Sequence, residues 1–444
     1  MYWMKKSNKY KKSFFLPEMG FKEQASCLNQ KKLAVYTVLA FLLIALFRLW
    51  FYYPFSAIDG TLLQDSAHIV INSYSSSSSS SPEEEAAGQK NKPLCDYTDG
   101  KWVRGEMGPL YNGTTCGTIK DGQNCLRHGR PDSGYLYWKW KPNQCDIPRF
   151  DPTRFLDLLR DKHLAFIGDS MARNQLESLL CMLATFSTPN LVYRNGEDNK
   201  FRRWLFKSHN LTVSVYWSPF LVAGKEKSTE SGLDHNVLHL ERVDEKWAKD
   251  LDQMDVVVLS VGHWFLHPAM YLESGSVLGC HSCPARNCTE IGFFEVFRKA
   301  IRTTLRSVVS NRGRHRHRDV VLTTFSPSHF EGRPWDSLGA CNMTEPYEGK
   351  ALEGMDEEMR RIEMEEVAAA NAGTNTNVEA LDVTGLSILR PDGHPGPYMY
   401  AFPFKNGVPD RIHNDCLHWC LPGPVDTWNE ILLEVLRRWM DHVW

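Results

Sequence analysis

A serine stands in the stretch LAFIGDSMARNQ, residues 164–175, where an apolar run becomes an amphipathic one. Ser170 follows Gly168 and Asp169, so the pattern places it at a turn from a buried strand into a helix. At such a turn the hydroxyl projects above the sheet, and the backbone N–H at the positive end of the helix can stabilise an oxyanion. Ser170 is therefore a candidate nucleophile. The alternative is that it only caps the helix, where Asp169 is favoured by the helix dipole.

A serine hydroxyl needs a base, and the base needs an acid that orients it. Near the C-terminus, the stretch HNDCLHWC places Asp415 three residues before His418. On a helical turn this spacing puts the two on one face, so the carboxylate can hold the imidazole. Cys416 and Cys420 flank His418, and disulfides there would fix the loop that carries the base. The alternative is a surface histidine in a stapled loop.

The two motifs lie in a region where apolar and amphipathic segments alternate. Five apolar runs predict buried strands: HLAFIG, LTVSVYW, DVVVLSVG, DVVLTTF and VEALDVT. Helical periodicity covers residues 171–184, 291–310, 353–370 and 425–441. Apolar strands separated by helices predict an α/β fold in layers. Three strands end in GDS, GHW and SPSH, and in such folds ligands bind beyond the carboxyl ends of the strands.

The motifs GDSMARNQ, GHWF and DCLHWC, in this order, resemble those of the plant trichome birefringence-like proteins. These are Golgi polysaccharide O-acetyltransferases of the GDSL/SGNH type, and the resemblance covers residues 93–444. The stretch GTTCGTIKDGQNCLRHGRPDSGYLYWKWKP is most similar to the xyloglucan-acetylating branch. The resemblance implies an SGNH-hydrolase-like layered sheet with helices on both faces. It also implies that Ser170 is the acetyl-accepting nucleophile, His418 its base and Asp415 the orienting acid.

The rest of the site follows the family pattern less closely. In SGNH hydrolases a Gly and an Asn on separate loops complete the oxyanion hole. Here GHW stands where Gly-x-Asn is expected, so Gly262 remains a candidate donor and the Asn is missing. Arg173 and Asn174, one helical turn after Ser170, are our substitutes. For stacking on sugar rings we select Trp264 and Trp419, although each suits a core position equally well.

Three functions of different class fit these residues. The first is transfer of an acetyl group, through acetyl-Ser170, to a hydroxyl of a hemicellulose; the second is an acetylesterase with the same triad. The third, a glycan-binding membrane protein without chemistry, is disfavoured by the intact triad. Exclusion of water separates the first two, and the resemblance selects transfer, with xyloglucan as acceptor. We expect no bound cofactor, an acetyl donor such as acetyl-CoA or a derivative, and Golgi proteins that supply it as partners.

Two other clusters are interpreted without chemistry. Cys280, His281, Cys283 and Cys288 have a spacing that suits zinc, but the sequon at Asn287 within the cluster and the oxidising setting favour disulfides, so we expect no metal. The basic run NRGRHRHRD predicts a solvated loop. The formal net charge of −2 gives no reason to expect a nucleic-acid partner.

The N-terminal part of the chain predicts a membrane anchor. Residues 33–53, LAVYTVLAFLLIALFRLWFYY, are long enough to cross a bilayer as a helix. Eight lysines against two glutamates in residues 1–32 predict a cytosolic tail. The serine-rich residues 54–92 predict a disordered stem. Residues 93–444 then form the lumenal domain of a single-pass type II Golgi protein, with a loop-rich, cysteine-rich section at 93–150 and the α/β catalytic part at 151–444.

Cysteines and glycosylation sequons agree with this topology. Eleven of the twelve cysteines follow the predicted span, as do four Asn-x-Ser/Thr sequons, at Asn112, Asn210, Asn287 and Asn342. This distribution predicts a disulfide-bonded domain in an oxidising compartment. Because eleven is odd, one cysteine lacks a partner within the domain, and Cys181, in an apolar helical stretch, is the first candidate.

Overall fold

The computed structural model describes residues 95–440, except 196–199, 229–231, 284–286, 311–317, 373 and 375. The chain divides into two units, and all described residues belong to the second, Lys90–Trp444. The predicted transmembrane helix, the predicted stem and most of the basic run therefore lie outside the described residues. Within the described ranges no helix combines the length and the hydrophobicity that a membrane span requires.

A seven-stranded sheet forms the centre of the domain. Its spatial order is β13 (Val378–Leu381), β12 (Asp319–Thr323), β9 (Val256–Ser260), β3 (His163–Gly168), β6 (Leu211–Trp217), β5 (Phe201–Phe206) and β4 (Asn190–Asn195). The first five strands are parallel, and β5 and β4 extend the sheet in antiparallel pairing. All five strands predicted from apolar runs are confirmed, because burial on both faces makes them continuously hydrophobic.

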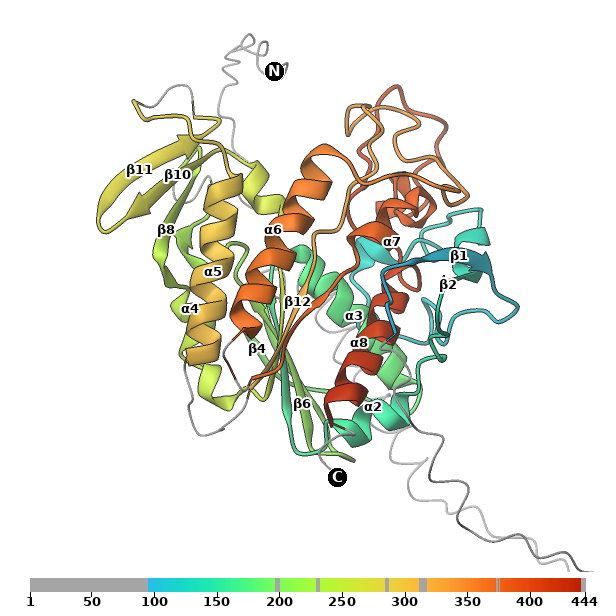
Figure 1. Ribbon diagram of the computed structural model, residues 1–444. Coiled ribbons are helices and arrows are strands. Elements are labelled where there is room, and N and C mark those ends of the chain that lie inside the picture. Colours follow the sequence, from blue (N-terminus) through green and yellow to red (C-terminus); the bar gives the residue numbers. More distant parts are fainter. Residues whose placement is uncertain are drawn as a thin grey trace, which may run out of the picture. The chain divides into compact units, whose positions relative to one another are not determined.

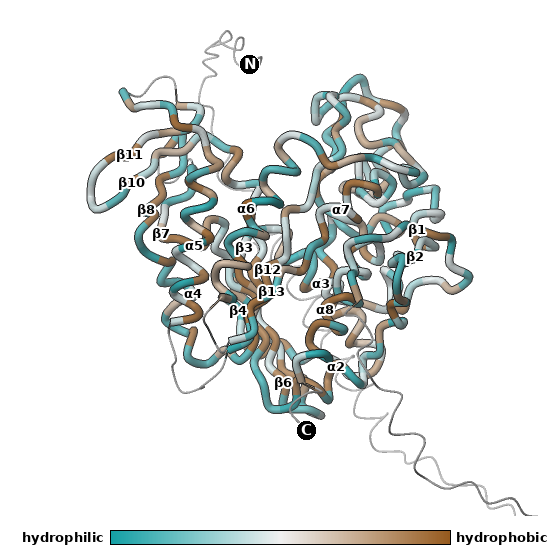
Figure 2. Tube along the Cα trace, viewed as in Figure 1, coloured by the Kyte–Doolittle hydropathy of each residue, from teal (hydrophilic) through white to brown (hydrophobic). Residues whose placement is uncertain are grey.

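Helices cover both faces of this sheet (Figure 1). On one face lie α2 (Pro152–Leu158), α3 (Ser170–Ala184) and α8 (Val425–Met440), and on the other α5 (Phe294–Ser310) and α6 (Gly354–Asn371). Each face has its own hydrophobic core, and Figure 2 shows hydrophobic residues concentrated along the central strands and α8. The four long helices agree with the predicted periodic segments within a few residues.

Two smaller sheets were not predicted. One has the order β11 (Ser276–His281), β10 (Ala269–Glu273), β8 (Asn236–Val243) and β7 (Val222–Lys225), and the other pairs β1 (Gly100–Arg104) with β2 (Trp138–Pro142). The short helices are α4 (Glu245–Ala248) and α7 (Thr384–Ile388). Single 3₁₀ turns lie at Asp121–Gln123, Gly134–Tyr137, Leu251–Gln253, His263–Leu266, Pro391–Gly393 and Pro397–Met399.

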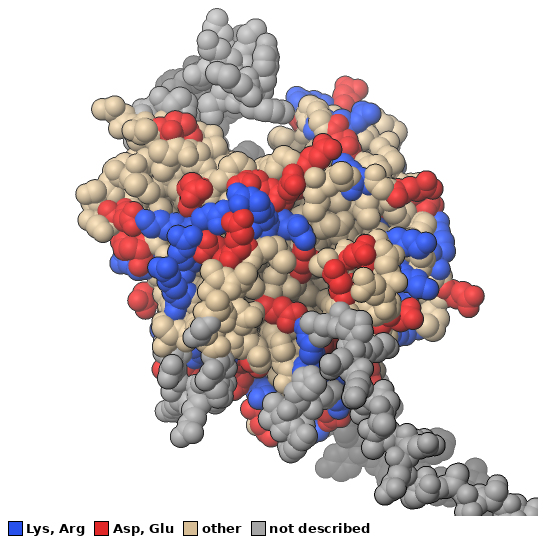
Figure 3. Space-filling view, viewed as in Figure 1, with Lys and Arg blue, Asp and Glu red and all other residues tan. Residues whose placement is uncertain are grey.

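The outer surface of α5 and α6 carries charges of both signs. Arg298 pairs with Glu365 and Glu366, and Arg361 pairs with Glu365. Figure 3 shows basic and acidic side chains intermingled across this face of the molecule. The two helices are therefore joined by an ion-pair network on the surface as well as by the core beneath it.

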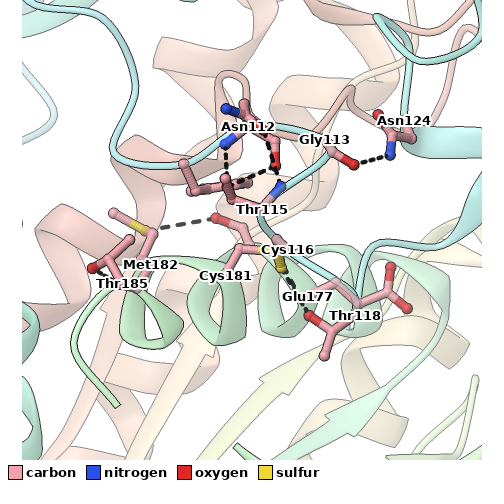
Figure 4. Close-up of a disulfide and its surroundings, with 12 residues drawn as sticks. Asn112, Gly113, Thr115, Cys116, Thr118, Asn124, Glu177, Cys181, Met182 and Thr185 are labelled. Atoms are coloured by element: carbon pink, nitrogen blue, oxygen red, sulfur yellow. Dashed lines mark hydrogen bonds between the residues drawn. A yellow bond between two sulfur atoms is a disulfide. The ribbon is translucent and has the colours of Figure 1, made fainter. Parts of the chain in front are cut away.

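Five disulfides stabilise the domain: Cys95–Cys145, Cys116–Cys181, Cys125–Cys420, Cys280–Cys288 and Cys341–Cys416. The prediction that Cys181 lacks a partner is wrong, because Cys116 of the N-terminal section reaches it on α3 (Figure 4). Cys283 lies outside the five bonds, and its thiol donates to the carbonyl of His281 at 3.3 Å. The pairing of Cys280 with Cys288 confirms the disulfide interpretation of that cluster.

Candidate active site

Ser170 is the first residue of α3, directly after the central strand β3. Gly168 is required at this turn, because an added Cβ would lie 1.8 Å from the carbonyl oxygen of Ser260 on β9. Asp169 is the N-cap: its Oδ1 accepts a hydrogen bond from the backbone N–H of Met171 at 2.9 Å. The interpretation of Ser170 as the helix cap is therefore wrong. Asp169 caps the helix, so the Ser170 hydroxyl is not needed as a cap.

Asp415 and His418 form the predicted acid–base pair. His418 Nδ1 lies 2.8 Å from Asp415 Oδ2, and the backbone N–H groups of Leu417 and His418 donate to Oδ1 at 3.1 and 2.9 Å. Burial alone would raise the pKa of Asp415, but the charge of His418 and these hydrogen bonds hold it well below its usual value. The ionised carboxylate fixes the proton on Nδ1, so Nε2 carries the basic lone pair.

The Nε2 atom of His418 is buried and has no hydrogen-bond partner among the described residues. A buried nitrogen that is left unpaired is costly, and a catalytic role is one explanation for it. In the tautomer that Asp415 imposes, this nitrogen can accept a proton from a hydroxyl group. This position suits a general base, the role predicted for His418.

Asn174 joins the turn that carries His418 to the helix that begins with Ser170. Its Oδ1 accepts from the backbone N–H of Trp419 at 2.7 Å, and its Nδ2 donates to the carbonyl of Trp419 at 3.3 Å. Because both polar atoms of the Asn174 amide bind the Trp419 backbone, Asn174 positions the turn that carries His418. Its role as an oxyanion donor stays a prediction.

Two disulfides fix the same turn, as the cysteines flanking His418 predicted. Cys416 is bonded to Cys341 in the loop after β12, and Cys420 is bonded to Cys125 in the N-terminal section. The segment between them is thus held at both ends to parts of the chain far away in sequence. Such anchoring keeps a catalytic side chain in a single geometry.

The three predicted strand ends meet around this turn. His263, after β9, forms a hydrogen bond from Nε2 to the carbonyl of Ser326 at 2.8 Å, and Ser326 Oγ accepts from Trp419 Nε1 at 3.0 Å. Ser326 follows β12, so the ends of β9 and β12 both reach the segment that carries His418. Burial lowers the pKa of His263 to about 4, so this ring is neutral and serves as a hydrogen-bonding support.

Two buried histidines beside His418 escaped the sequence analysis as site residues. His394 Nδ1 lies 2.7 Å from the carbonyl oxygen of His418, and His394 Nε2 lies 2.7 Å from His329 Nδ1. The SPSH motif contains His329, but no local pattern distinguishes His394. Trp419 is fully buried and stacks on the His394 ring, with 4.1 Å between ring centroids. Trp419 is therefore a core residue, and its prediction as a sugar-stacking residue is wrong.

The other predicted oxyanion and sugar contacts keep their candidate roles. The guanidinium of Arg173 lies 5.6 Å from the centre of the Trp217 ring, and Trp264, half-buried, packs edge-on against Trp217. At Gly262 an added Cβ would lie 2.4 Å from the ring of Phe325, so no side chain fits. The roles of Gly262 and Arg173 at an oxyanion and of Trp264 at a sugar stay predictions.

Asp169 adds an unusual buried carboxyl to the cluster. Burial raises its pKa to about 6, against the opposing effects of the Met171 N–H, the charge of His418 and the Gly262 N–H. Its second oxygen, Oδ2, has no hydrogen-bond partner among the described residues.

A serine at a strand-to-helix turn, with an Asp–His pair docked on the same helix, defines a serine-dependent acyl-transfer enzyme on a layered α/β fold. The chain belongs to the PC-Esterase family, described as the GDSL/SGNH-like acyl-esterase family found in Pmr5 and Cas1p, whose model matches residues 147–435. The PMR5 N-terminal domain model matches residues 93–146, which contain β1, β2 and four of the cysteines.

Named plant proteins are similar over most of the chain. Xyloglucan O-acetyltransferase 1 of Arabidopsis thaliana is 72% identical over 423 residues, which cover 95% of this chain and 100% of that protein. Xyloglucan O-acetyltransferase 1 of Populus trichocarpa is 60% identical and covers 92% of this chain and 94% of its own length. Protein trichome birefringence-like 25 of Arabidopsis thaliana is 43% identical, with 79% and 78% covered.

Proposed function

We propose that this protein is a polysaccharide O-acetyltransferase that acetylates xyloglucan through an acetyl-Ser170 intermediate. The observation that carries the proposal is the docking of the Asp415–His418 turn on α3 by Asn174, which directs a paired histidine to the helix that Ser170 begins. The choice of transfer and of xyloglucan is supported by relatives that bear this name and are up to 72% identical.

The reaction takes two steps at one serine. Ser170 Oγ bonds to the carbonyl carbon of the donor acetyl group as its proton passes to His418 Nε2. The bond to the donor leaving group then breaks, and that group takes the proton from His418. In the second step a sugar hydroxyl gives its proton to Nε2 while its oxygen bonds to the acetyl carbon. The ester bond to Ser170 breaks, and Oγ regains the proton.

We also propose the setting in which this chemistry takes place. The protein is a type II Golgi membrane protein, anchored by residues 33–53, with the catalytic domain in the lumen. The donor is acetyl-CoA or a derived acetyl carrier delivered by membrane proteins of the same compartment. The support is the lysine-rich tail, the apolar run and the cysteine distribution, together with the five disulfides of the described domain.

A transfer assay tests the function. The purified full-length protein is incubated with an acetyl donor and, in parallel, with unacetylated xyloglucan, mannan and xylan oligosaccharides, and products are identified by mass. Gain of acetyl on xyloglucan alone supports both the reaction and the acceptor. Loss of acetyl from pre-acetylated oligosaccharides, faster than any transfer, identifies an esterase and overturns the proposal.

A further inference from the structure

A cavity of about 360 Å³ lies in the N-terminal section, between the β1–β2 region and the first turns of α8. Its walls come from residues 105–110, residues 135–139 and the segment from Gly423 to Glu430. Met182, near the end of α3, also lines it. Since Met182 follows Ser170 by twelve residues, a rise of 1.5 Å per residue places this wall about 18 Å along the helix from the nucleophile. This wall of the cavity is therefore remote from the nucleophile.

The cavity contains polar groups that the protein itself does not use. Tyr135 is 1% exposed and lines the cavity, yet its hydroxyl has no hydrogen-bond partner among the described residues. Trp138 also lines the cavity, and its indole N–H likewise has no hydrogen-bond partner among the described residues. Buried donors without partners are costly in a folded protein. Because both residues line the cavity, a ligand that enters between these side chains would supply the missing acceptors.

Two carboxyl groups complete the polar lining. Asp426 and Glu430 lie one turn apart on α8, and Asp426 Oδ1 accepts from Tyr111 and Ser178 at 2.7 and 2.6 Å. Burial raises the pKa of Asp426 to about 6 and that of Glu430 to about 7. Glu430 is thus partly protonated near neutral pH, and a protonated carboxyl both donates and accepts.

The charge of the lining favours a neutral ligand. Three acidic residues, Glu106, Asp426 and Glu430, are balanced by three basic ones, Lys139, Arg149 and Arg390. Arg390 is further neutralised by Asp392 at 2.8 Å, and Arg149 donates to the carbonyl of Gly108. The remaining walls are aromatic and aliphatic, with Tyr137 and Met107 exposed at the rim. A compact neutral ligand with hydroxyl groups and apolar faces matches this lining.

We propose that this cavity is a second sugar-binding site, which holds neutral pyranose units of the acceptor polysaccharide away from Ser170. That the sugar belongs to the acceptor rests on the proposed function; the class of ligand rests on the cavity alone. A chain bound at two points reaches the nucleophile at a raised effective concentration. Long acceptors gain from the second site, whereas acceptors too short to span both sites do not.

A binding experiment tests the site without catalysis. Full-length Ser170→Ala protein is titrated calorimetrically with unacetylated xyloglucan oligosaccharides of increasing length. Adding Tyr135→Phe or Glu430→Met removes one hydrogen-bonding group each and should weaken binding of the long oligosaccharides about fivefold, the value of one hydrogen bond. The matched controls are Tyr193→Phe on β4 and Glu245→Met on α4, both distant from the cavity in the fold. Unchanged affinity in both cavity variants overturns the proposal.

Kinetics of the otherwise wild-type enzyme supply the second readout. With Tyr135→Phe, KM for polymeric xyloglucan should rise about fivefold, while KM for the shortest accepted oligosaccharide should stay constant. An equal change for both acceptors, or a change in kcat alone, contradicts a second site. If no acceptor is acetylated at all, the proposed function fails, and the titration alone still decides whether the cavity binds sugar.

Discussion

At the residue scale, the structure separates two functions that meet at the start of α3. Asp169 caps the helix, so replacing Ser170 with Ala should change the free energy of unfolding by less than the roughly 0.5–2 kcal/mol that loss of a cap costs. Turnover should fall by about 10⁴-fold or more, because a nucleophile and its base act as one unit. His418→Ala should show the same loss. The measurement is acetyl transfer alongside thermal unfolding.

Trapping the acetyl intermediate tests directly whether Ser170 is the nucleophile. Wild-type protein incubated with donor alone should carry one acetyl group on a peptide that contains Ser170, identified by mass. A Ser170→Ala protein that retains normal transfer rates, or a trapped acetyl group on another peptide, would show that the hydroxyl is not the nucleophile.

The raised pKa of Asp169 predicts a pH dependence of stability. The carboxyl ionises near pH 4 in the unfolded chain but at about pH 6 in the folded protein. The folded state therefore binds more protons across this window, and its stability falls as the pH rises from about 4 to 6. Asp169→Asn, which still caps the helix, should remove the contribution of Asp169 to this slope. It should exceed the wild type in unfolding free energy by up to about 3 kcal/mol above pH 6 and match it near pH 4.

Denaturant unfolding of both proteins between pH 4 and 8 measures the difference. Wild-type and variant curves that run parallel over this range would mean that Asp169 does not titrate within it. Asn190→Asp on the exposed strand β4 is a suitable control for an added surface carboxyl, whose pKa stays near that of a free side chain.

At the element scale, the coupling of α3 to the catalytic turn depends on one side chain. Asn174→Ala removes the partners of the Trp419 backbone N–H and carbonyl, both held at buried positions. Each unsatisfied buried group costs about 1–3 kcal/mol of stability. The turn with His418 also loses the hydrogen bonds that hold it against α3. We expect lower stability and a fall in kcat that exceeds the fall expected from unfolded protein alone. The exposed Asn190→Ala should change neither; an Asn174→Ala enzyme with normal kcat per folded molecule would contradict the positioning role.

The disulfides at the same turn allow a matched comparison. Cys416→Ser or Cys420→Ser should cost about 2–5 kcal/mol of stability and also reduce kcat, because the segment with Asp415 and His418 loses an anchor. The double variant Cys280→Ser, Cys288→Ser removes a disulfide from β11, at the edge of the four-stranded sheet. It should lower stability with little effect on kcat. Equal losses of kcat in both sets would show that the effect is general destabilisation.

The elements themselves differ in how well their sequences predict them. The five parallel strands are mostly apolar, and α5 shows one buried stripe that includes Val296, Phe297, Ala300 and Ile301. Such patterns follow from burial, so a short stretch of sequence is enough to predict these elements. The strands of the smaller sheet mix charge and apolar residues, as in NVLHLERV of β8. Their pairing depends on neighbours from elsewhere in the chain, so the sequence alone does not reveal them.

The site residues also differ in how well the sequence predicts them. Ser170, Asp415 and His418 stand in compact motifs, and the Asp–His contact follows from a spacing of three residues. The partner of Cys181, the burial of Trp419 and the engagement of the Asn174 amide all depend on contacts across long sequence separations. A residue type suited to chemistry is then indistinguishable from one suited to structure until its neighbours are known.

At the scale of the whole molecule, two kinds of feature bear on the predicted membrane topology. One is the sequence before the described domain, and the other is the surface of that domain. A lysine-rich start before residues 33–53 predicts that everything after the span is lumenal. A domain with five disulfides is typical of proteins in an oxidising compartment, which agrees with this prediction. The four sequon asparagines are all exposed in the folded domain, at the positions Asn112, Asn210, Asn287 and Asn342. A glycan on any of them would extend into solvent without disturbing the core.

We therefore predict that the protein carries N-linked glycans when expressed in plant cells. Glycosidase treatment should lower its apparent mass, and each single Asn→Gln change at an occupied sequon should remove one step of that shift. Because these side chains are exposed, the single variants should unfold within about 0.5 kcal/mol of the unmutated protein, as surface substitutions generally do. Protease protection in intact Golgi vesicles, lost on addition of detergent, is the independent check of sidedness. A protein with no occupied sequon, or one digested in sealed vesicles, would reverse the predicted topology and remove the catalytic domain from the lumen.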